Sequence, residues 1–211
     1  GLIAYLFYID STLAIIFYPL ALIGFANLSV LRIVVLGLMA ISFIHLFLIL
    51  KNYRHYFHHF LEWFESNLHL KLLLFLMMLG YALLSLSPIT NADSLDYHIG
   101  VALHILNTGN MPATPEWFHS RVSGNGEVLN AIGFAAGAEQ FGSLLQFVSL
   151  VSILGLIYHA GSNPSERANR IKEFDDRWRL LLTIAAASPP VLVALIGSVK
   201  PQLLPAAMTS L

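Results

Sequence analysis

The sequence contains no cysteine, which excludes disulfide bonds and thiolate metal sites and leaves the redox compartment undetermined. Charged residues are also scarce, because Asp, Glu, Lys and Arg make up 11% of the 211 residues, where a soluble domain carries roughly a quarter. The formal net charge is -1, and no basic run is interleaved with aromatic residues. The chain therefore lacks the features of a nucleic-acid-binding protein.

Hydrophobic residues make up 57% of the chain, and its mean hydropathy is +0.72. Several uncharged runs approach or reach the roughly 20 residues that a helix needs to cross the hydrocarbon core of a bilayer. They are too numerous for a signal peptide or a single anchor, so the sequence predicts an all-α, polytopic bundle of transmembrane helices. The chain begins at Gly1 and stops at Leu211 directly after an apolar segment, and we expect it to be part of a longer protein.

The predicted membrane spans follow the apolar runs. They cover residues 2–25, 30–50, 72–87, 131–158 and 180–199, and the last is interrupted by Pro189 and Pro190. Residues 51–71 combine polar and aromatic side chains, which is typical of an interfacial helix. Residues 161–179 are predicted to form a charged loop.

The distribution of lysine and arginine predicts the orientation, because short cytoplasmic loops carry the excess of positive charge. The segments 51–71 and 161–179 hold most of these residues, so both are predicted to face the cytoplasm. The segment 88–127, with Arg121 as its single basic residue, then faces outward. We expect a multi-pass protein of the inner (plasma) membrane whose active face is extracytoplasmic.

The outer segment contains apolar residues at helical spacing within "LDYHIGVALHILNTGN". The pattern predicts a short helix that is capped by Asp93 or Ser94, ends at Gly109 and lies along the membrane surface. A second short helix is predicted to begin near Glu127 and to run into "IGFAAGAEQFG". There, Gly133 and Gly137 favour close packing against another helix.

The order of these segments resembles the amino-terminal half of the GT-C superfamily, polytopic glycosyltransferases that use sugars carried on polyprenyl phosphate. The resemblance rests on the layout of residues 72–211 and on the pattern D-x-L-x-Y-H in "DSLDYHIGVALHIL". It implies a truncated GT-C-like core at 72–211, preceded by two extra transmembrane helices at 1–50 and the cytoplasmic interfacial segment 51–71. It also implies an essential acidic residue in the first outer loop, just after a span.

Asp93 is the predicted catalytic residue. Inverting sugar transfer needs a carboxylate to take the proton from the acceptor hydroxyl, and Asp93 follows the third span at the outer mouth of the bundle. The alternative role for Asp93 is a helix N-cap. The leaving group is a phosphate, which a nearby cation or a divalent metal ion would stabilise.

Further substrate contacts are predicted around Asp93, each with a structural alternative. Asp96 lies three residues further on, so on a helix it would roughly share a face with Asp93. It is predicted to hold a sugar hydroxyl or to assist a metal with Asp93, and the alternative is a solvated surface acid. His98 contacts substrate or makes a structural hydrogen bond. Arg121 and Lys200 are predicted to bind the donor phosphate. The alternative for Arg121 is a contact with lipid headgroups, and the alternative for Lys200 is a side chain that extends to the membrane interface.

Glu127 is predicted as a further substrate contact or, alternatively, as the acid that caps the second outer helix. The histidines at 55 and 59 share a helical face, but no further ligands accompany them, so we do not predict zinc there. The predicted partners are the bilayer, a polyprenyl-phosphate-linked sugar and a glycan, lipid or protein acceptor. A transporter or flippase, or a noncatalytic assembly subunit, is the alternative function.

Overall fold

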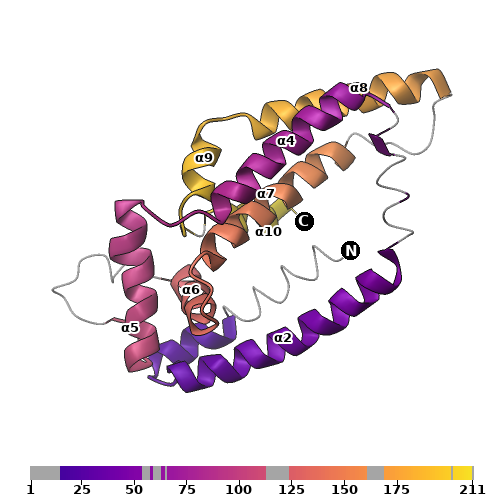
Figure 1. The fold of residues 1–211 in the computed structure, drawn as a ribbon. Helices are drawn as coiled ribbons and strands as arrows, with labels where there is room; N and C mark the ends of the chain where they lie inside the picture. The colour runs from indigo at the N-terminus through magenta and orange to yellow at the C-terminus, as the bar shows by residue number, and fades with distance from the viewer. Residues whose placement is uncertain are drawn as a thin grey trace.

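The computed structural model describes residues 15–53, 58, 63–64, 66–112, 124–160, 169–200 and 202–210, and these contain helices and no strand. Residues 15–22 are helical. The elements that follow are α2 (Leu28–Lys51), α4 (Leu68–Ser85), the π-helix η1 (Ser94–Ile99), α5 (Gly100–Thr108), α6 (Asn125–Ala135), α7 (Phe141–Ala160), α8 (Asn169–Ala187), α9 (Val191–Ile196) and α10 (Leu203–Ser210) (Figure 1). The described part of the chain is all-α, as predicted.

Among the described residues, α2, α4 and α7 are long and apolar enough to cross a membrane. Their spanning segments are residues 28–48, 68–85 and 141–160, which correspond to the second, third and fourth predicted spans. The shortest has 18 residues, and at 1.5 Å per residue it extends about 27 Å, close to the thickness of the hydrocarbon core. Large apolar side chains on α2 and α4 are exposed, as they are on helices that face lipid.

The helices α4, α7 and α8 pack together, and α9 lies against α4 and α7 (Figure 1). Tyr81, Leu154 and Ile196 belong to the core between them. The Tyr81 hydroxyl donates to the carbonyl oxygen of Ala187 at 2.7 Å, which joins α4 to the end of α8. The helices α5 and α6 lie at the end of this bundle where α4 ends, and α2 packs against them.

The predicted start of the fourth span at residue 131 is wrong, because the span α7 begins at Phe141 and the preceding residues belong to α6, which ends at Ala135. Gly137 adopts a left-handed conformation with φ of 75°. The N–H of Ala138 donates to the carbonyl of Gly133, and that of Gly137 to the carbonyl of Phe134, both at 2.9 Å. These two bonds form a Schellman motif, which ends the helix.

The two glycines of this region therefore have different roles. A Cβ atom at Gly133 would lie 2.5 Å from the Cβ of Phe141, so this glycine permits a close approach between α6 and the start of α7. A Cβ atom at Gly137 would meet nothing within 4 Å, so this glycine serves the turn and not a packing contact. The predicted small-residue packing face is thus confined to Gly133.

The predicted charged loop is corrected, and the fifth span is broken at its prolines. The helix α8 begins at Asn169, so the charged residues from 169 to 179 are helical. The apolar run that follows is interrupted at 188–190, where Pro189 and Pro190 lack the N–H groups that would continue the helix. The interruption predicted at Pro189 and Pro190 is therefore present, and because α9 has only six residues after it, no candidate span covers 180–199 among the described residues.

Several predictions fall wholly or partly outside the described residues. The first span is described only from residue 15, and of the predicted interfacial segment 51–71 the structure describes 51–53, 58, 63–64 and 66–71. Arg121 and the histidines at 55 and 59 are not among the described residues.

Candidate functional site at the end of α4

The helix that contains Asp93 is capped by Asn91. The Asn91 side-chain oxygen accepts a hydrogen bond from the backbone N–H of Ser94 at 3.2 Å. Asp93 itself has helical torsion angles (φ -60°, ψ -39°) and makes no side-chain capping bond. The predicted capping role of Asp93 or Ser94 is therefore wrong.

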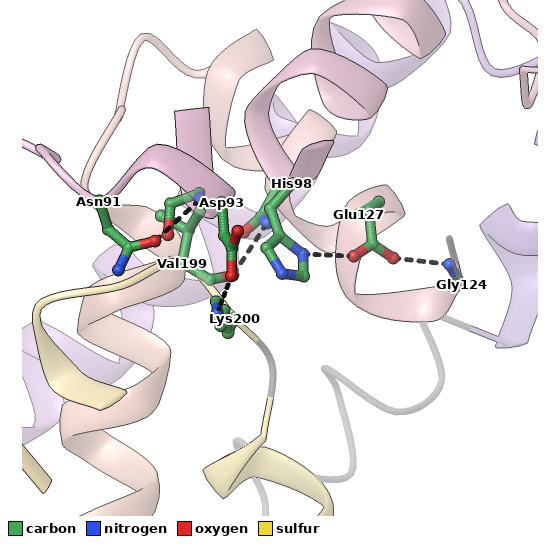
Figure 2. Close-up of polar contacts among 9 residues, drawn as sticks. Asn91, Asp93, His98, Gly124, Glu127, Val199 and Lys200 are labelled. Carbon is green, nitrogen blue, oxygen red and sulfur yellow. Dashed lines mark hydrogen bonds and ion pairs between the residues drawn. The ribbon is translucent and has the colours of Figure 1, made fainter. Parts of the chain in front are cut away.

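The first turns after Asn91 form a π-helix, in which hydrogen bonds run from residue i to i+5 and which is often found at functional sites. The prediction that Asp93 and Asp96 share a face assumed α-helical spacing. In the wider π-helix, residues five apart lie on one side, and Figure 2 shows Asp93 next to His98. Asp96 is exposed on η1.

Asp93 forms an ion pair with Lys200, with 2.7 Å between the carboxylate oxygen and Nζ. The Asp93 side chain is 69% exposed and that of Lys200 is 23% exposed. The backbone beside Lys200 is held from two helices. Asn130 of α6 donates its side-chain N–H to the Val199 carbonyl at 3.2 Å, and Ser143 of α7 donates its hydroxyl to the Ser198 carbonyl at 3.4 Å.

His98 and Glu127 form a second, buried pair beside the first. His98 Nδ1 lies 2.6 Å from a Glu127 carboxylate oxygen, and their side chains are only 6% and 3% exposed. The other oxygen of Glu127 accepts the N–H of Gly124 at 2.6 Å, so Glu127 also caps α6. The capping role predicted for Glu127 is confirmed, and the same side chain fixes the His98 ring.

The Tyr97 ring covers the His98 ring, with 3.9 Å between their centroids. Burial raises the pKa of Tyr97, and the negative charges of Glu127 and Asp93 raise it further. The Tyr97 phenol therefore stays neutral at physiological pH, and negative charge in this region resides on carboxylates.

The site combines an exposed carboxylate with a cation, and a buried imidazole with a carboxylate (Figure 2). Such groups can accept a proton from a hydroxyl and bind a phosphate. The described residues contain no group of three or more His, Asp or Glu that could hold a metal ion. A metal at Asp93 and Asp96 would thus need ligands from elsewhere.

Two polar residues of this region, Asn91 and Asn130, were not predicted from the sequence. Asn91 stands three residues before Ser94, which is the spacing of a capping side chain and its N–H partner, so this signal was present. Asn130 lies within an apolar helix and acts on a carbonyl 69 residues away, for which the sequence has no signal.

A second polar cluster lies at the other end of α4, where Lys71 is buried with its side chain 3% exposed. Its ammonium donates to the Trp63 carbonyl at 2.5 Å and to the Ser66 hydroxyl at 2.9 Å, and lies 3.2 Å from Asp176 of α8. The Tyr158 hydroxyl of α7 donates to the other Asp176 oxygen at 2.5 Å. This cluster joins α4, α7 and α8.

Asp176 also accepts hydrogen bonds from Ser66 at 3.2 Å and from the Asn67 amide at 3.1 Å. Burial alone would raise the pKa of Asp176. The hydrogen bonds from Tyr158, Asn67 and Lys71, together with the charge of Lys71, outweigh burial, and the pKa lies below its usual range. Asp176 is therefore a carboxylate at physiological pH.

The described residues thus form a helical protein with three helices able to cross a membrane and a charged site at one end of the bundle. Residues 44–211 match the model of the DUF1420 N-terminal domain, and the chain belongs to this family. No curated protein and no solved structure matches the chain.

Proposed function

We propose that the chain is the amino-terminal part of an inverting membrane glycosyltransferase of the GT-C type. It transfers a sugar from a polyprenyl-phosphate donor to an acceptor hydroxyl at the extracytoplasmic face. The observation that supports this most is the Asp93 carboxylate, which is exposed and binds Lys200 at 2.7 Å beside the end of a candidate span.

The Asp93–Lys200 ion pair suits a resting state in which the base and the phosphate-binding cation neutralise each other. When the donor binds, its phosphate replaces Asp93 as the partner of Lys200. The released Asp93 carboxylate then takes the proton of the acceptor hydroxyl as its oxygen bonds to the anomeric carbon. The bond from that carbon to the phosphate oxygen breaks, and the phosphate leaves as an anion beside Lys200.

His98 orients a hydroxyl of the substrate in this proposal. Glu127 lies 2.6 Å from Nδ1, so Nε2 of the His98 ring is the nitrogen that contacts a substrate hydroxyl. Glu127 is thus a positioning residue, since its second oxygen is already bound to the N–H of Gly124. Asp96 is exposed on the same π-helix and supplies a secondary contact to the sugar.

The test is transfer of sugar from a polyprenyl-phosphate donor by the purified full-length protein in lipid. Asp93→Asn keeps the size of the side chain but removes its charge and basicity, and we expect turnover to fall roughly a hundredfold to ten-thousandfold. Asp96→Asn is the matched control three residues away, with a loss of about 1 to 3 kcal/mol at most.

Thermal stability is measured on both variants, so that loss of turnover can be separated from loss of fold. Folded Asp93→Asn protein that transfers sugar at the wild-type rate would show that Asp93 is not the base. Equal and large losses in both variants would show that the negative charge of η1 matters rather than the Asp93 position.

A further inference from the structure

Lys200 lies in a short link between α9 and α10 whose flanking residues are buried. Ser198 and Val199 before it and Leu203 after it are buried, whereas the Lys200 side chain is 23% exposed. The link is not helical at 198–200. Its backbone groups therefore need hydrogen-bond partners from other elements, because a buried and unpaired N–H or carbonyl is costly. The groups that bind this link determine where Lys200 lies.

Side chains from α6 and α7 hold the link on both sides of Lys200. Before it, Asn130 of α6 donates to the Val199 carbonyl at 3.2 Å. After it, the N–H of Leu203 donates to Oε1 of Gln146, a residue of α7, at 2.8 Å. Leu203 is the first residue of α10, so its N–H has no partner within that helix, and Gln146 supplies the missing acceptor.

Gln146 is a polar residue inside a helix that is a candidate membrane span, and its side chain is buried. Burial of an amide is unfavourable unless its polar atoms are hydrogen-bonded. Oε1 has its partner in Leu203, but Nε2 is buried without a hydrogen-bond partner among the described residues. The amide therefore adds little to stability, and its distinctive effect is to fix the start of α10 relative to α7.

We propose that Gln146 is a positioning residue for Lys200. By binding the N–H of Leu203 it fixes the link from one side, as Asn130 does from the other, and so keeps the Lys200 ammonium 2.7 Å from the Asp93 carboxylate. In the proposed glycosyl transfer, the same placement keeps Lys200 where the donor phosphate binds. That second role rests on the proposed function, whereas the placement of the ion pair does not.

The first test measures the ion pair without any transfer reaction. A water-soluble carbodiimide joins a carboxylate to an amine only when the two are in contact, so the yield of the Asp93–Lys200 amide, quantified by peptide mass spectrometry, reports their proximity. Gln146→Met keeps an unbranched side chain of similar length but removes the amide. In the full-length protein in lipid, we expect it to lower the yield roughly fivefold, which corresponds to the loss of one hydrogen bond of about 1 kcal/mol.

Ser149→Ala is the matched control on the same helix. Ser149 is also buried, but its hydroxyl donates to the Leu145 carbonyl at 2.6 Å, within α7, and does not reach the link. The control should leave the coupling yield unchanged. Thermal unfolding of both variants separates a local movement of Lys200 from a general loss of fold.

The second test asks whether Gln146 acts on donor binding through Lys200. Gln146→Met should raise the KM for the polyprenyl-phosphate donor about fivefold in the wild-type background. In a Lys200→Met background it should raise the donor KM no further, because the group that it positions is gone. A purely structural role would instead give the same additional effect in both backgrounds.

A coupling yield that Gln146→Met leaves unchanged would overturn the proposal, whatever the protein transfers. An unchanged donor KM in Gln146→Met, where Lys200→Met raises it, would overturn the role in donor binding. If Lys200→Met itself leaves the donor KM unchanged, the proposed function fails, and the coupling yield alone decides whether Gln146 positions Lys200. If Gln146→Met does not fold, Asn130→Leu, which removes the donor on the other side of Lys200, is measured in the same way and decides.

Discussion

Removal of Asp176 should destabilise the protein more than removal of its partner Lys71. Asp176→Asn leaves the Lys71 ammonium, 3% exposed, without a counter-charge, and breaking a buried ion pair in this way costs about 3 to 5 kcal/mol. We expect the lower end of this range, about 3 kcal/mol, because the Asp176 side chain is 20% exposed and water reaches part of it.

Lys71→Met has a smaller expected effect. It leaves the Asp176 carboxylate with donors from Ser66, Asn67 and Tyr158 at 3.2, 3.1 and 2.5 Å, and the methionine fills the space of the lysine stem. The expected loss of stability is about 2 kcal/mol, because the hydrogen bond that is lost joins charged groups, and such bonds contribute about 1.5 to 3 kcal/mol each. The three remaining hydrogen bonds still stabilise the Asp176 carboxylate.

The assay is equilibrium unfolding of the purified protein in mixed micelles, followed by far-ultraviolet circular dichroism and by Trp fluorescence. The double variant Lys71→Met with Asp176→Leu should be more stable than Asp176→Asn alone, because it removes both charges together. If Asp176→Asn costs less than about 1 kcal/mol, or if the double variant is the least stable, the buried pair does not join α4 to α8 as described.

Three further predictions concern the same fold. Folding lowers the pKa of Asp176 from 3.8, so its carboxylate stabilises the fold above that value and the stabilisation is lost as pH falls through the lower folded pKa. The free energy of unfolding, measured between about pH 6 and 3, should therefore decrease with falling pH, and Asp176→Asn should remove this part of the decrease. Asn91→Ala should cost about 1 kcal/mol in thermal unfolding through loss of the cap, and an unchanged stability would contradict the capping assignment. Gly142→Ala should cost about 1 to 3 kcal/mol, because its Cβ would meet the Asn130 side-chain oxygen and lie 2.9 Å from the Val199 Cβ, whereas Gly155→Ala, with no such contact, should not destabilise the protein.

Much of the helical architecture was predictable because hydropathy and length determine which segments can cross a bilayer. The runs at 30–50 and 72–87 are long and almost entirely apolar, and both correspond to candidate spans. The errors arose where backbone chemistry overrides hydropathy. Gly137 ends α6 inside an apolar run, and α8 begins at Asn169 within a charged one.

The predicted site could be assembled only in part from the sequence. Glu127 as a helix cap depends on local spacing, and the structure agrees. The contact of Asp93 with Lys200 joins residues 107 apart, and that of His98 with Glu127 joins residues 29 apart, so both follow from packing that a single sequence does not reveal. The π-helix changes which residues share a face, and local propensity does not predict it.

The central claim, that Asp93 takes the proton while Lys200 holds the donor phosphate, is tested most directly by measuring kcat and KM separately for Asp93→Asn and Lys200→Met in the full-length protein. Asp93→Asn should lower kcat with little change in the KM for the polyprenyl-phosphate donor, because the base acts in the transition state. Lys200→Met should raise the donor KM and also lower kcat, since the phosphate gains charge as it leaves. A wild-type kcat for folded Asp93→Asn protein, or a donor KM that Lys200→Met leaves unchanged, would contradict the account.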